Sequence, residues 1–315
     1  MIEVTGLSKQ FGDVRAVDDL TFQVKKGEIL GFLGPNAAGK TTTMRIITGI
    51  IPASSGKVSV AGFDEFHNPK EVKRRIGYLP ENPPLYQDMR VEDYLRFVAA
   101  IKNVRCRSID AEIRRVSEKL AITMVLDDFI ASLSRGFKQR VGLAQALIGD
   151  PPVLIFDEPT IGLDPRQIIE VRELIRNLAH EHTVILSTHI LPEVSMTCDR
   201  VVIINEGRLV AVDTPENLTD RLKGSESVQL EIEGPSDEIM KVLQTIPKVR
   251  SVGCSATRKE EISEYSIETN LGADIRRELA ATIVKNGWGL LEMKTEKLSL
   301  EDIFLKLTTS EEGMN

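Results

Sequence analysis

Short, unbroken apolar runs are the clearest pattern in this chain. The first run covers residues 28–33, and three more lie at residues 152–156, 183–187 and 200–204. Runs of this length are typical of strands that are buried on both faces of a parallel sheet. Residues 166–179 carry a helical pattern between two of these runs. Strand–helix–strand alternation of this kind predicts a mainly parallel α/β core.

The intervening segments show other periods. Apolar and polar residues alternate in several short stretches that are bounded by glycine, proline or other turn residues, which is typical of strands. From residue 91 to about residue 121, apolar residues recur at helical spacing, and residues 134–148 form a further helix candidate. The additional strands are predicted at residues 1–7, 20–24, 56–62 and 75–79.

Composition changes near residues 222–226, where we place a domain boundary. The pattern that follows predicts the order β-α-β-β-α-β, which suits a small ferredoxin-like α/β sandwich. We therefore expect a first domain at 1–222, a second at 226–309 and a frayed tail at 310–315. Within the second domain, strands are predicted at 228–233, 249–256, 265–269 and 289–295, and helices at 236–245, 273–286 and 299–307.

Bulk composition excludes some classes of function. Of 315 residues, 42% are hydrophobic and 28% are charged, as in ordinary globular proteins. A net charge of −7 argues against nucleic-acid binding through a broad basic face. The three cysteines, Cys106, Cys198 and Cys254, lack C-x-x-C spacing, so we expect free thiols in a cytoplasmic protein. We see no signal peptide and no apolar stretch near the roughly 20 residues that cross a bilayer.

Residues 34–41 carry the phosphate-binding pattern G-x-x-x-x-G-K-[ST]. A predicted strand precedes this loop and a predicted helix follows it, so the positive end of the helix would face an anion. Lys40 would reach the terminal phosphates, and the Thr41 hydroxyl would hold Mg²⁺. The expected nucleotide-binding residues of the loop are Gly34, Pro35, Asn36, Ala37, Ala38, Gly39, Lys40, Thr41 and Thr42.

Two adjacent carboxylates, Asp157 and Glu158, follow directly on the apolar run 152–156. A strand in a parallel sheet delivers such groups to the ligand-binding edge. Asp157 suits a Mg²⁺ partner, and Glu158 suits a base that polarises an attacking water. The alternative is a solvated acidic pair at a strand end.

Together with further motifs in the same order, these residues resemble the ATP-binding subunit of an ABC transporter over roughly residues 1–220. Residues 133–140 resemble the family signature, residues 162–164 the loop after the acidic pair, and residues 187–189 the switch-histidine segment. Phe11 stands where the family has an aromatic residue that stacks on adenine. The resemblance assigns nucleotide contacts also to Ser134, Gly136 and Asp164, and catalytic roles to Lys40, Glu158 and His189.

The resemblance also implies an architecture and partners. The expected fold is a P-loop NTPase core with an N-terminal antiparallel β subdomain and a helical insertion at about 85–150. Ser134 and Gly136 would contact ATP bound by a second copy, so hydrolysis would need a head-to-tail dimer, which we expect to be a homodimer. Residues 76–86 and 299–304 look like those of ABC-2-type exporters, including drug-export and gliding-motility relatives. Such a subunit would use ATP and Mg²⁺, bind a separate membrane-spanning permease and lie on the inner face of the cell membrane.

The chain departs from the family pattern at four positions. Ala37 replaces a glycine, which costs on the order of 1 kcal/mol if the residue needs a positive φ. Arg135 and Phe137 replace the usual second glycine and the glutamine of the signature. Glu81 replaces a glutamine that touches Mg²⁺ and faces the membrane partner. We expect Glu81 to be functional, because its carboxylate would either bind Mg²⁺ more strongly or pair with a basic residue of that partner.

Two other functions are compatible with a phosphate loop. A non-transport ABC ATPase acting on ribosomes or nucleic acid fits poorly, because this chain carries one ATPase unit, lacks long coiled coils and is acidic. A different phosphate-loop enzyme, such as a kinase, would not need the signature or His189. His180 and His182 lie in a polar segment between a helix and a strand, where we expect solvated side chains rather than a metal site.

Overall fold

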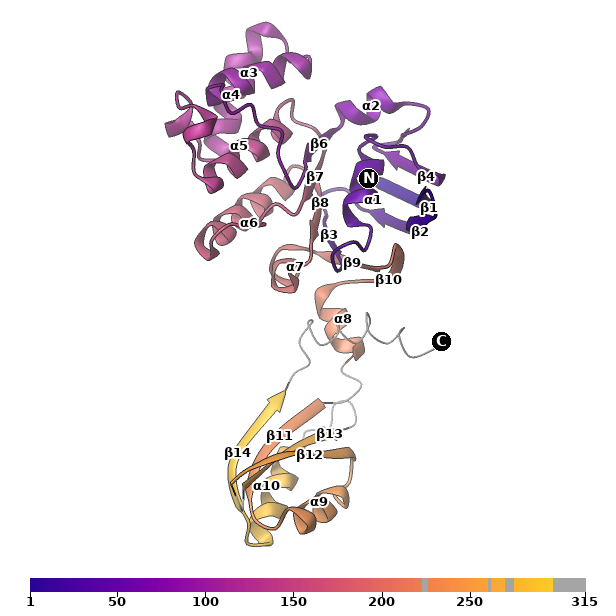
Figure 1. The fold of residues 1–315 in the computed structure, drawn as a ribbon, viewed down its shortest axis with the longest axis vertical. Coiled ribbons are helices and arrows are strands. Elements are labelled where there is room, and N and C mark those ends of the chain that lie inside the picture. Colours follow the sequence, from indigo (N-terminus) through magenta and orange to yellow (C-terminus); the bar gives the residue numbers. More distant parts are fainter. Residues whose placement is uncertain (223–225, 260–261, 270–274, 297–315) are drawn as a thin grey trace. The chain divides into compact units, whose positions relative to one another are not determined.

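Three β-sheets organise the chain in the computed structural model, which describes residues 1–222, 226–259, 262–269 and 275–296 (Figure 1). The chain divides into two compact units, Met1–Pro215 and Glu216–Asn315. The predicted helix at 299–307 and the tail at 310–315 lie outside the described residues.

A six-stranded sheet forms the centre of the first unit, in the order β10-β9-β3-β8-β7-β6. Five of its strands are parallel, and only β10 runs antiparallel to its neighbour. Every residue of β3, β7 and β8 is buried, as the unbroken apolar runs predict. The strands are β3 (Ile29–Leu33), β6 (Ile76–Leu79), β7 (Val153–Asp157), β8 (Thr183–Thr188), β9 (Arg200–Asn205) and β10 (Arg208–Asp213).

A second, antiparallel sheet in the order β2-β1-β4-β5 packs in the same unit. One hydrophobic core joins this sheet to helix α1 (Lys40–Ile47) and to the inner strands of the large sheet. Met44, Ile46 and Ile47 of α1 are fully buried within that core. The helix that follows the phosphate loop is therefore fixed between two sheets. The strands are β1 (Ile2–Phe11), β2 (Val14–Val24), β4 (Ser55–Val60) and β5 (Phe63–Asp64).

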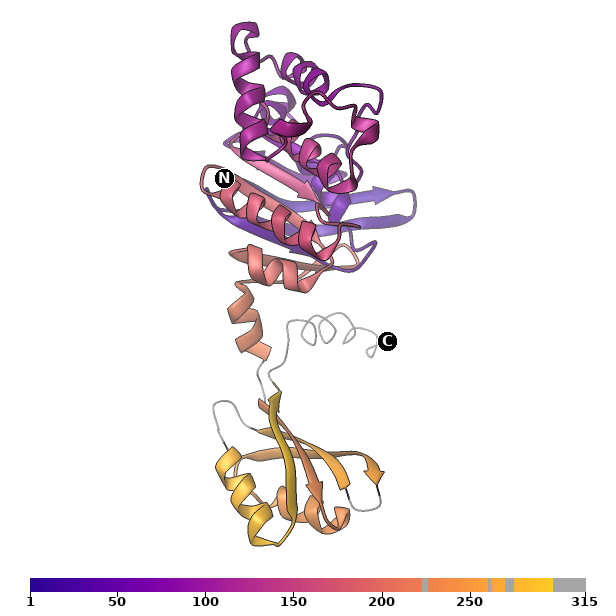
Figure 2. The same ribbon diagram turned by 90° about the vertical axis from the view of Figure 1, so that its left-hand side faces the viewer.

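Three helices between β6 and β7 gather at one end of this unit: α3 (Val91–Ile101), α4 (Ile109–Lys119) and α5 (Arg135–Leu147) (Figure 1). Their apolar positions recur at helical spacing and are buried against one another. Helix α6 (Pro165–Ala179) lies across a face of the large sheet (Figure 2). The remaining elements of this unit are the helices α2 (Pro69–Arg74) and α7 (Leu191–Thr197), and the 3₁₀ turns Cys106–Ser108, Thr123–Val125 and Ile130–Ser132. Helix α8 (Pro215–Leu222) begins at the last residue of the unit.

The second unit contains a four-stranded antiparallel sheet in the order β12-β13-β11-β14. Its elements follow one another as β-α-β-β-α-β. Apolar residues of both helices pack on the sheet to form a separate core. The elements are β11 (Glu226–Glu233), α9 (Ser236–Gln244), β12 (Val249–Lys259), β13 (Ile262–Thr269), α10 (Arg276–Lys285) and β14 (Gly289–Glu296).

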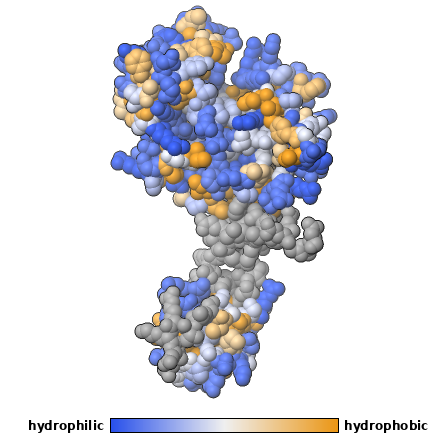
Figure 3. Space-filling model, viewed as in Figure 1, coloured by the Kyte–Doolittle hydropathy of each residue, from blue (hydrophilic) through white to orange (hydrophobic). Residues whose placement is uncertain are grey.

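The α/β core is confirmed, but several local details differ from the sequence pattern. Strand β2 begins at Val14 rather than at residue 20, and the helical stretch 91–121 is divided near Asn103, whose φ is +58°. The short elements α2, α7, α8, β5 and β10 were not predicted. Segments of two to eight residues contain too few repeats for a periodic pattern to stand out. The visible face of each unit is mainly hydrophilic, with hydrophobic side chains in scattered groups (Figure 3).

Candidate functional site

Three adjacent strands end at the same edge of the large sheet. Strand β8 lies between β3 and β7, with Leu33 opposite Thr188 and Asp157 opposite Ser187. Because these strands are parallel and in this register, the residues that follow them meet at the carboxyl edge, where α/β sheets bind ligands. The phosphate loop, Glu158 and His189 are thereby brought together.

The backbone of the loop after β3 requires glycine at two positions. A Cβ atom on Gly34 would lie 2.5 Å from the carbonyl oxygen of Ile204, and one on Gly39 would lie 2.4 Å from that of Ala16. Gly39 also has a φ of +96° and directly precedes helix α1. The loop thus fits tightly between β2 and β9, and the helix N-terminus faces the ligand edge.

Ala37 occupies a left-handed conformation with a φ of +66°. Residues with a Cβ atom are strained in this region by roughly 1–2 kcal/mol, whereas glycine is not. The departure from the family glycine therefore carries a conformational cost in this loop.

A cavity of about 500 Å³ opens beside the loop, which is within the usual size range of ligand pockets. The cavity brings together residues from β2, the phosphate loop, the segment after β6 and the ends of β7 and β8. Its lining residues are Ala16, Asn36, Ala37, Gly39, Lys40, Thr41, Thr42, Glu81, Glu158, Ile161 and His189.

Lys40 is the cationic group at the base of this cavity. Its Nζ donates hydrogen bonds to the carbonyl oxygens of Gly34 at 2.8 Å and Pro35 at 3.0 Å. The same Nζ lies 3.4 Å from Oε1 of Glu158, and Lys40 is only 6% exposed. The charge is therefore held between the loop and the carboxylate, within reach of an anion in the cavity.

Asp157 lies behind the loop and is fully buried. Its Oδ1 accepts hydrogen bonds from Thr41 Oγ1 at 3.2 Å and Ser187 Oγ at 2.5 Å. Its Oδ2 has no hydrogen-bond partner among the described residues. Burial raises the pKa of the Asp157 carboxyl, and the two hydrogen bonds offset part of this rise. A buried carboxylate oxygen without a partner, beside a threonine hydroxyl, fits the oxygen ligands that Mg²⁺ requires.

Glu158 and His189 form a contact across the ends of β7 and β8. Nδ1 of His189 lies 2.9 Å from Oε2 of Glu158. A carboxylate only accepts, so Nδ1 is the donor. The Glu158 backbone has a φ of +50°, and its N–H donates to both Oγ and the carbonyl oxygen of Ser187. The Glu158 side chain is thus held on both sides, by Lys40 and by His189.

Seven of the expected nucleotide contacts lie outside the cavity lining: Gly34, Pro35 and Ala38 in the loop itself, and four residues from other parts of the chain. Phe11 ends β1 and is 49% exposed, with Nζ of Lys9 5.0 Å from the ring centroid. Ser134 is exposed and caps α5 by accepting from the Phe137 N–H at 3.3 Å. Gly136 lies in the first turn of α5, and Asp164 caps α6 by accepting from the Gln167 N–H. One chain therefore brings only some of the expected nucleotide-binding residues to the cavity.

The departure at Arg135 has a local explanation. A Cβ atom on Gly162 would lie within 2.3 Å of the Arg135 guanidinium, so this side chain fills the space beside a glycine with a φ of +67°. The start of α5 is thereby packed against the loop that leads to Asp164. Glu81, by contrast, is exposed and lines the cavity.

Sequence reasoning missed the cavity residues Ala16 and Ile161, whose side chains carry no distinctive chemistry. It was wrong about His182, which is not solvated: this side chain is buried, and its Nδ1 lies 2.7 Å from the carbonyl oxygen of Pro151. The polar residues around it gave no sign that the turn before β7 contacts the ring. His180 is exposed, as expected.

The phosphate loop, the buried Asp157 and the Glu158–His189 pair on a parallel sheet define an ATPase cassette. The chain belongs to the ATP-binding subunits of ABC transporters: the model of the ABC transporter family matches residues 17–161. The chain is 34% identical to the bacitracin transport ATP-binding protein BcrA of Bacillus licheniformis, over 98% of this chain and 97% of that one. It is 29% identical to the linearmycin resistance ATP-binding protein LnrL of Bacillus subtilis, over 98% of both.

A solved structure shares the fold of the first unit. An ATP-binding subunit of an ABC transporter superposes with a TM-score of 0.64 at 31% identity, over 70% of this chain and 93% of that one. Among the described residues, no helix has the length and apolar character that crossing a membrane requires.

Proposed function

We propose that this chain hydrolyses ATP as a dimer and thereby powers export through a separate membrane-spanning permease. The observation that carries the proposal is the convergence of Lys40, Glu158 and His189 on one cavity beside the phosphate loop. Two relatives that match over nearly their whole length are named for bacitracin transport and linearmycin resistance. These names support the exporter class.

The phosphate loop would bind the triphosphate. Lys40 exchanges its contacts with Gly34 and Pro35 for phosphate oxygens, because a charge-assisted hydrogen bond to an anion is stronger than one to a neutral carbonyl. The N-terminal end of α1 adds N–H groups and a positive dipole. This exchange also takes Lys40 away from Glu158 and leaves that carboxylate available to a water molecule.

Glu158 acts as the base that polarises this water, and His189 positions the carboxylate and senses the terminal phosphate. Since His189 donates its Nδ1–H to Glu158, a hydrogen bond from Nε2 to phosphate requires a proton on both ring nitrogens. Thr41, Asp157 and Glu81 would hold Mg²⁺, which supplies charge stabilisation for the phosphates.

The dimer follows from where the remaining contacts lie. Ser134 already accepts from Phe137 N–H, yet its own hydroxyl proton stays available for a phosphate of another chain. Gly136 sits in the first turn of α5, whose N–H groups lack intrahelical partners. We propose a head-to-tail homodimer in which each α5 N-terminus completes the ATP site of the partner. Phe11 is half exposed at the surface, where its ring would stack on adenine.

An exposed aromatic group marks the surface we assign to the permease. The Tyr86 ring lies 6.0 Å from that of Tyr94 and 5.6 Å from that of Phe97. Tyr86 and Phe97 remain well exposed, as does Phe129 nearby in the same helical region. Exposed aromatic side chains are typical anchors of protein interfaces. We propose that the protein binds here to the inner face of the cell membrane through its permease.

Two measurements test this function. With ATP and Mg²⁺, light scattering should show that Glu158→Gln forms a stable dimer. The double variant that also carries Ser134→Arg should remain a monomer. A monomer in both cases would contradict the proposed head-to-tail dimer. Purification from membranes should recover a polytopic partner. Recovery with ribosomes or DNA alone would instead favour the non-transport ATPase.

A further inference from the structure

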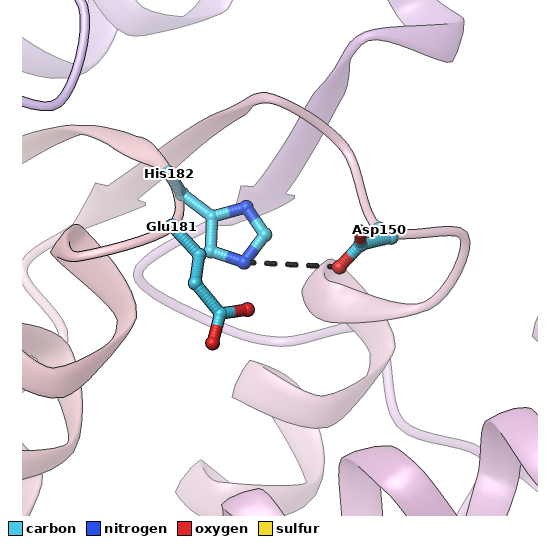
Figure 4. A group of neighbouring side chains, drawn as sticks. All are labelled: Asp150, Glu181 and His182. Carbon is cyan, nitrogen blue, oxygen red and sulfur yellow. Dashed lines mark ion pairs between the residues drawn. The ribbon is translucent and has the colours of Figure 1, made fainter.

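A second group of acidic and histidine side chains lies at the opposite edge of the same sheet. Asp150 lies in the turn before β7, and Glu181 and His182 lie directly before β8. Figure 4 shows the His182 ring directed toward the Asp150 carboxylate, with the Glu181 carboxylate beside it. Strand β7 has five residues and is therefore about 16 Å long, which separates this group from Asp157 at the other end of the strand.

The His182 ring is fixed through Nδ1, and its Nε2 is available as a metal ligand. The side chain is buried, with only 3% of the residue exposed. Its Nδ1 must donate to the carbonyl oxygen of Pro151, at 2.7 Å, because a carbonyl only accepts. Its Nε2 is buried without a hydrogen-bond partner among the described residues. The facing atom is Oδ1 of Asp150 at 3.9 Å, which is too long for a hydrogen bond.

The spacing suits a metal ion. One ligand atom each from Asp150, Glu181 and His182 lie within 4.8 Å of one another. A tetrahedral ion with bonds of about 2.0–2.2 Å separates its ligand atoms by about 3.4 Å. The two carboxylates are exposed, at 64% and 58% of their side chains, so they can turn inward while the ring stays fixed. Donation of the other ring N–H to a backbone carbonyl is the usual arrangement of a metal-binding histidine.

We propose that Asp150, Glu181 and His182 bind a divalent transition-metal ion, with Zn²⁺ as the best fit. An imidazole with two carboxylates suits Zn²⁺ and not Mg²⁺, which prefers oxygen ligands alone. Water would take the fourth position of the ion.

Two cations of α4 compete for the carboxylates. Nη1 of Arg115 lies 3.1 Å from Oδ1 of Asp150, and Nζ of Lys119 contacts Oε2 of Glu181. Exposed ion pairs of this kind are weak. Metal binding would therefore displace them and join the two turns at this edge of the sheet.

The test uses the full-length chain without an affinity tag, freed of metal and then saturated with Mg²⁺ and ATP. Titration with Co²⁺ should give the visible absorption of a tetrahedral site, and calorimetry with Zn²⁺ should give one ion per chain. His182→Asn keeps a donor for Pro151 and removes Nε2, and Asp150→Asn leaves the ring intact. Each should weaken Zn²⁺ binding more than about tenfold, whereas the exposed neighbour variant His180→Gln should bind like the wild type.

The competing cation gives an independent readout. Lys119→Ala should tighten Zn²⁺ binding by about two- to fivefold, because it frees Glu181 from an exposed pair. The proposal fails if no ion binds, or if His182→Asn and Asp150→Asn bind Zn²⁺ as tightly as the wild type. It also fails if nitrogen NMR shows a protonated His182 Nε2 that Zn²⁺ does not change, since a proton would then occupy the gap.

Discussion

An aspartate, a glutamate and a histidine lie at each end of the neighbouring strands β7 and β8. The two groups differ in which of these side chains are buried. At the carboxyl edge, Asp157 and Glu158 are buried, while the side chain of His189 is 37% exposed. At the amino edge the histidine is buried and the two carboxylates are exposed. Residue type alone therefore does not separate these two groups.

The difference in burial separates what each edge can do. The buried carboxylates at the carboxyl edge are held in place by Thr41, Ser187 and Lys40. Glu158 also lines the cavity beside a helix N-terminus. This arrangement suits a fixed reaction centre with an exposed histidine that can respond to the ligand. A fixed imidazole with two exposed carboxylates, each held only by a surface ion pair, suits the capture of an ion instead.

The largest expected effect is at the carboxyl edge. Glu158→Gln should lower the ATP hydrolysis rate by about 10²–10⁴, because it removes the proposed base while keeping the shape of the side chain. ATP binding, measured by fluorescence titration, should persist. Glu173→Gln, on the exposed side of α6, is the control and should hydrolyse ATP normally. Near-normal turnover by Glu158→Gln would remove the functional contrast between the two edges.

Asp157→Asn should abolish Mg²⁺-dependent ATP binding yet stabilise the nucleotide-free chain, by on the order of 1 kcal/mol near neutral pH. The pKa of Asp157 is raised above 3.8, so the folded state holds this proton more tightly than the unfolded state. Stability of the wild type should therefore fall as pH rises through the folded-state pKa.

Thermal unfolding from acidic to neutral pH measures this effect. The extra free energy of unfolding that Asp157→Asn has over the wild type should vanish at pH values below 3.8 and grow as the pH rises above 3.8. A constant gain at all pH values would show that the buried charge is not its source.

Ala37→Gly should raise the free energy of unfolding by about 0.5–1 kcal/mol. Glycine relieves roughly 1–2 kcal/mol of strain at a φ of +66°, less the entropy it adds to the unfolded chain. Chemical denaturation measures the change. Ala38→Gly is the matched control: Ala38 is buried and lacks a positive φ, so this variant should be less stable than the wild type. Equal effects of the two variants would rule out strain.

The smallest effect is expected at the amino edge without metal. Lys119→Ala should cost less than about 1 kcal/mol of stability, because its pair with Glu181 is exposed to solvent. A double-mutant cycle with Glu181→Gln isolates the pair, and its coupling energy should shrink in high salt. A salt-independent coupling well above 1 kcal/mol would mean that α4 is held by a buried interaction instead.

Much of the first unit could be predicted because its signals are long or unusual. The unbroken runs that became β3, β7, β8 and β9 indicated a parallel sheet, and the residues 34–41 marked its ligand edge. Short elements such as α2 and α7 were not predicted, since one or two helical turns give little periodicity in the sequence. The contact of Glu158 with both Lys40 and His189 also required the strand register, which no local pattern contains.

By itself, the sequence determined the family, the parallel α/β core and the residue types available for ATP chemistry, because each depends on local spacing. Only the tertiary structure decided the backbone angle of Ala37, the missing partner of Asp157 Oδ2 and the burial of His182. These features depend on what other segments place around a residue. A loop between two sheets, or a ring covered by a distant turn, leaves no trace in the neighbouring letters of the chain.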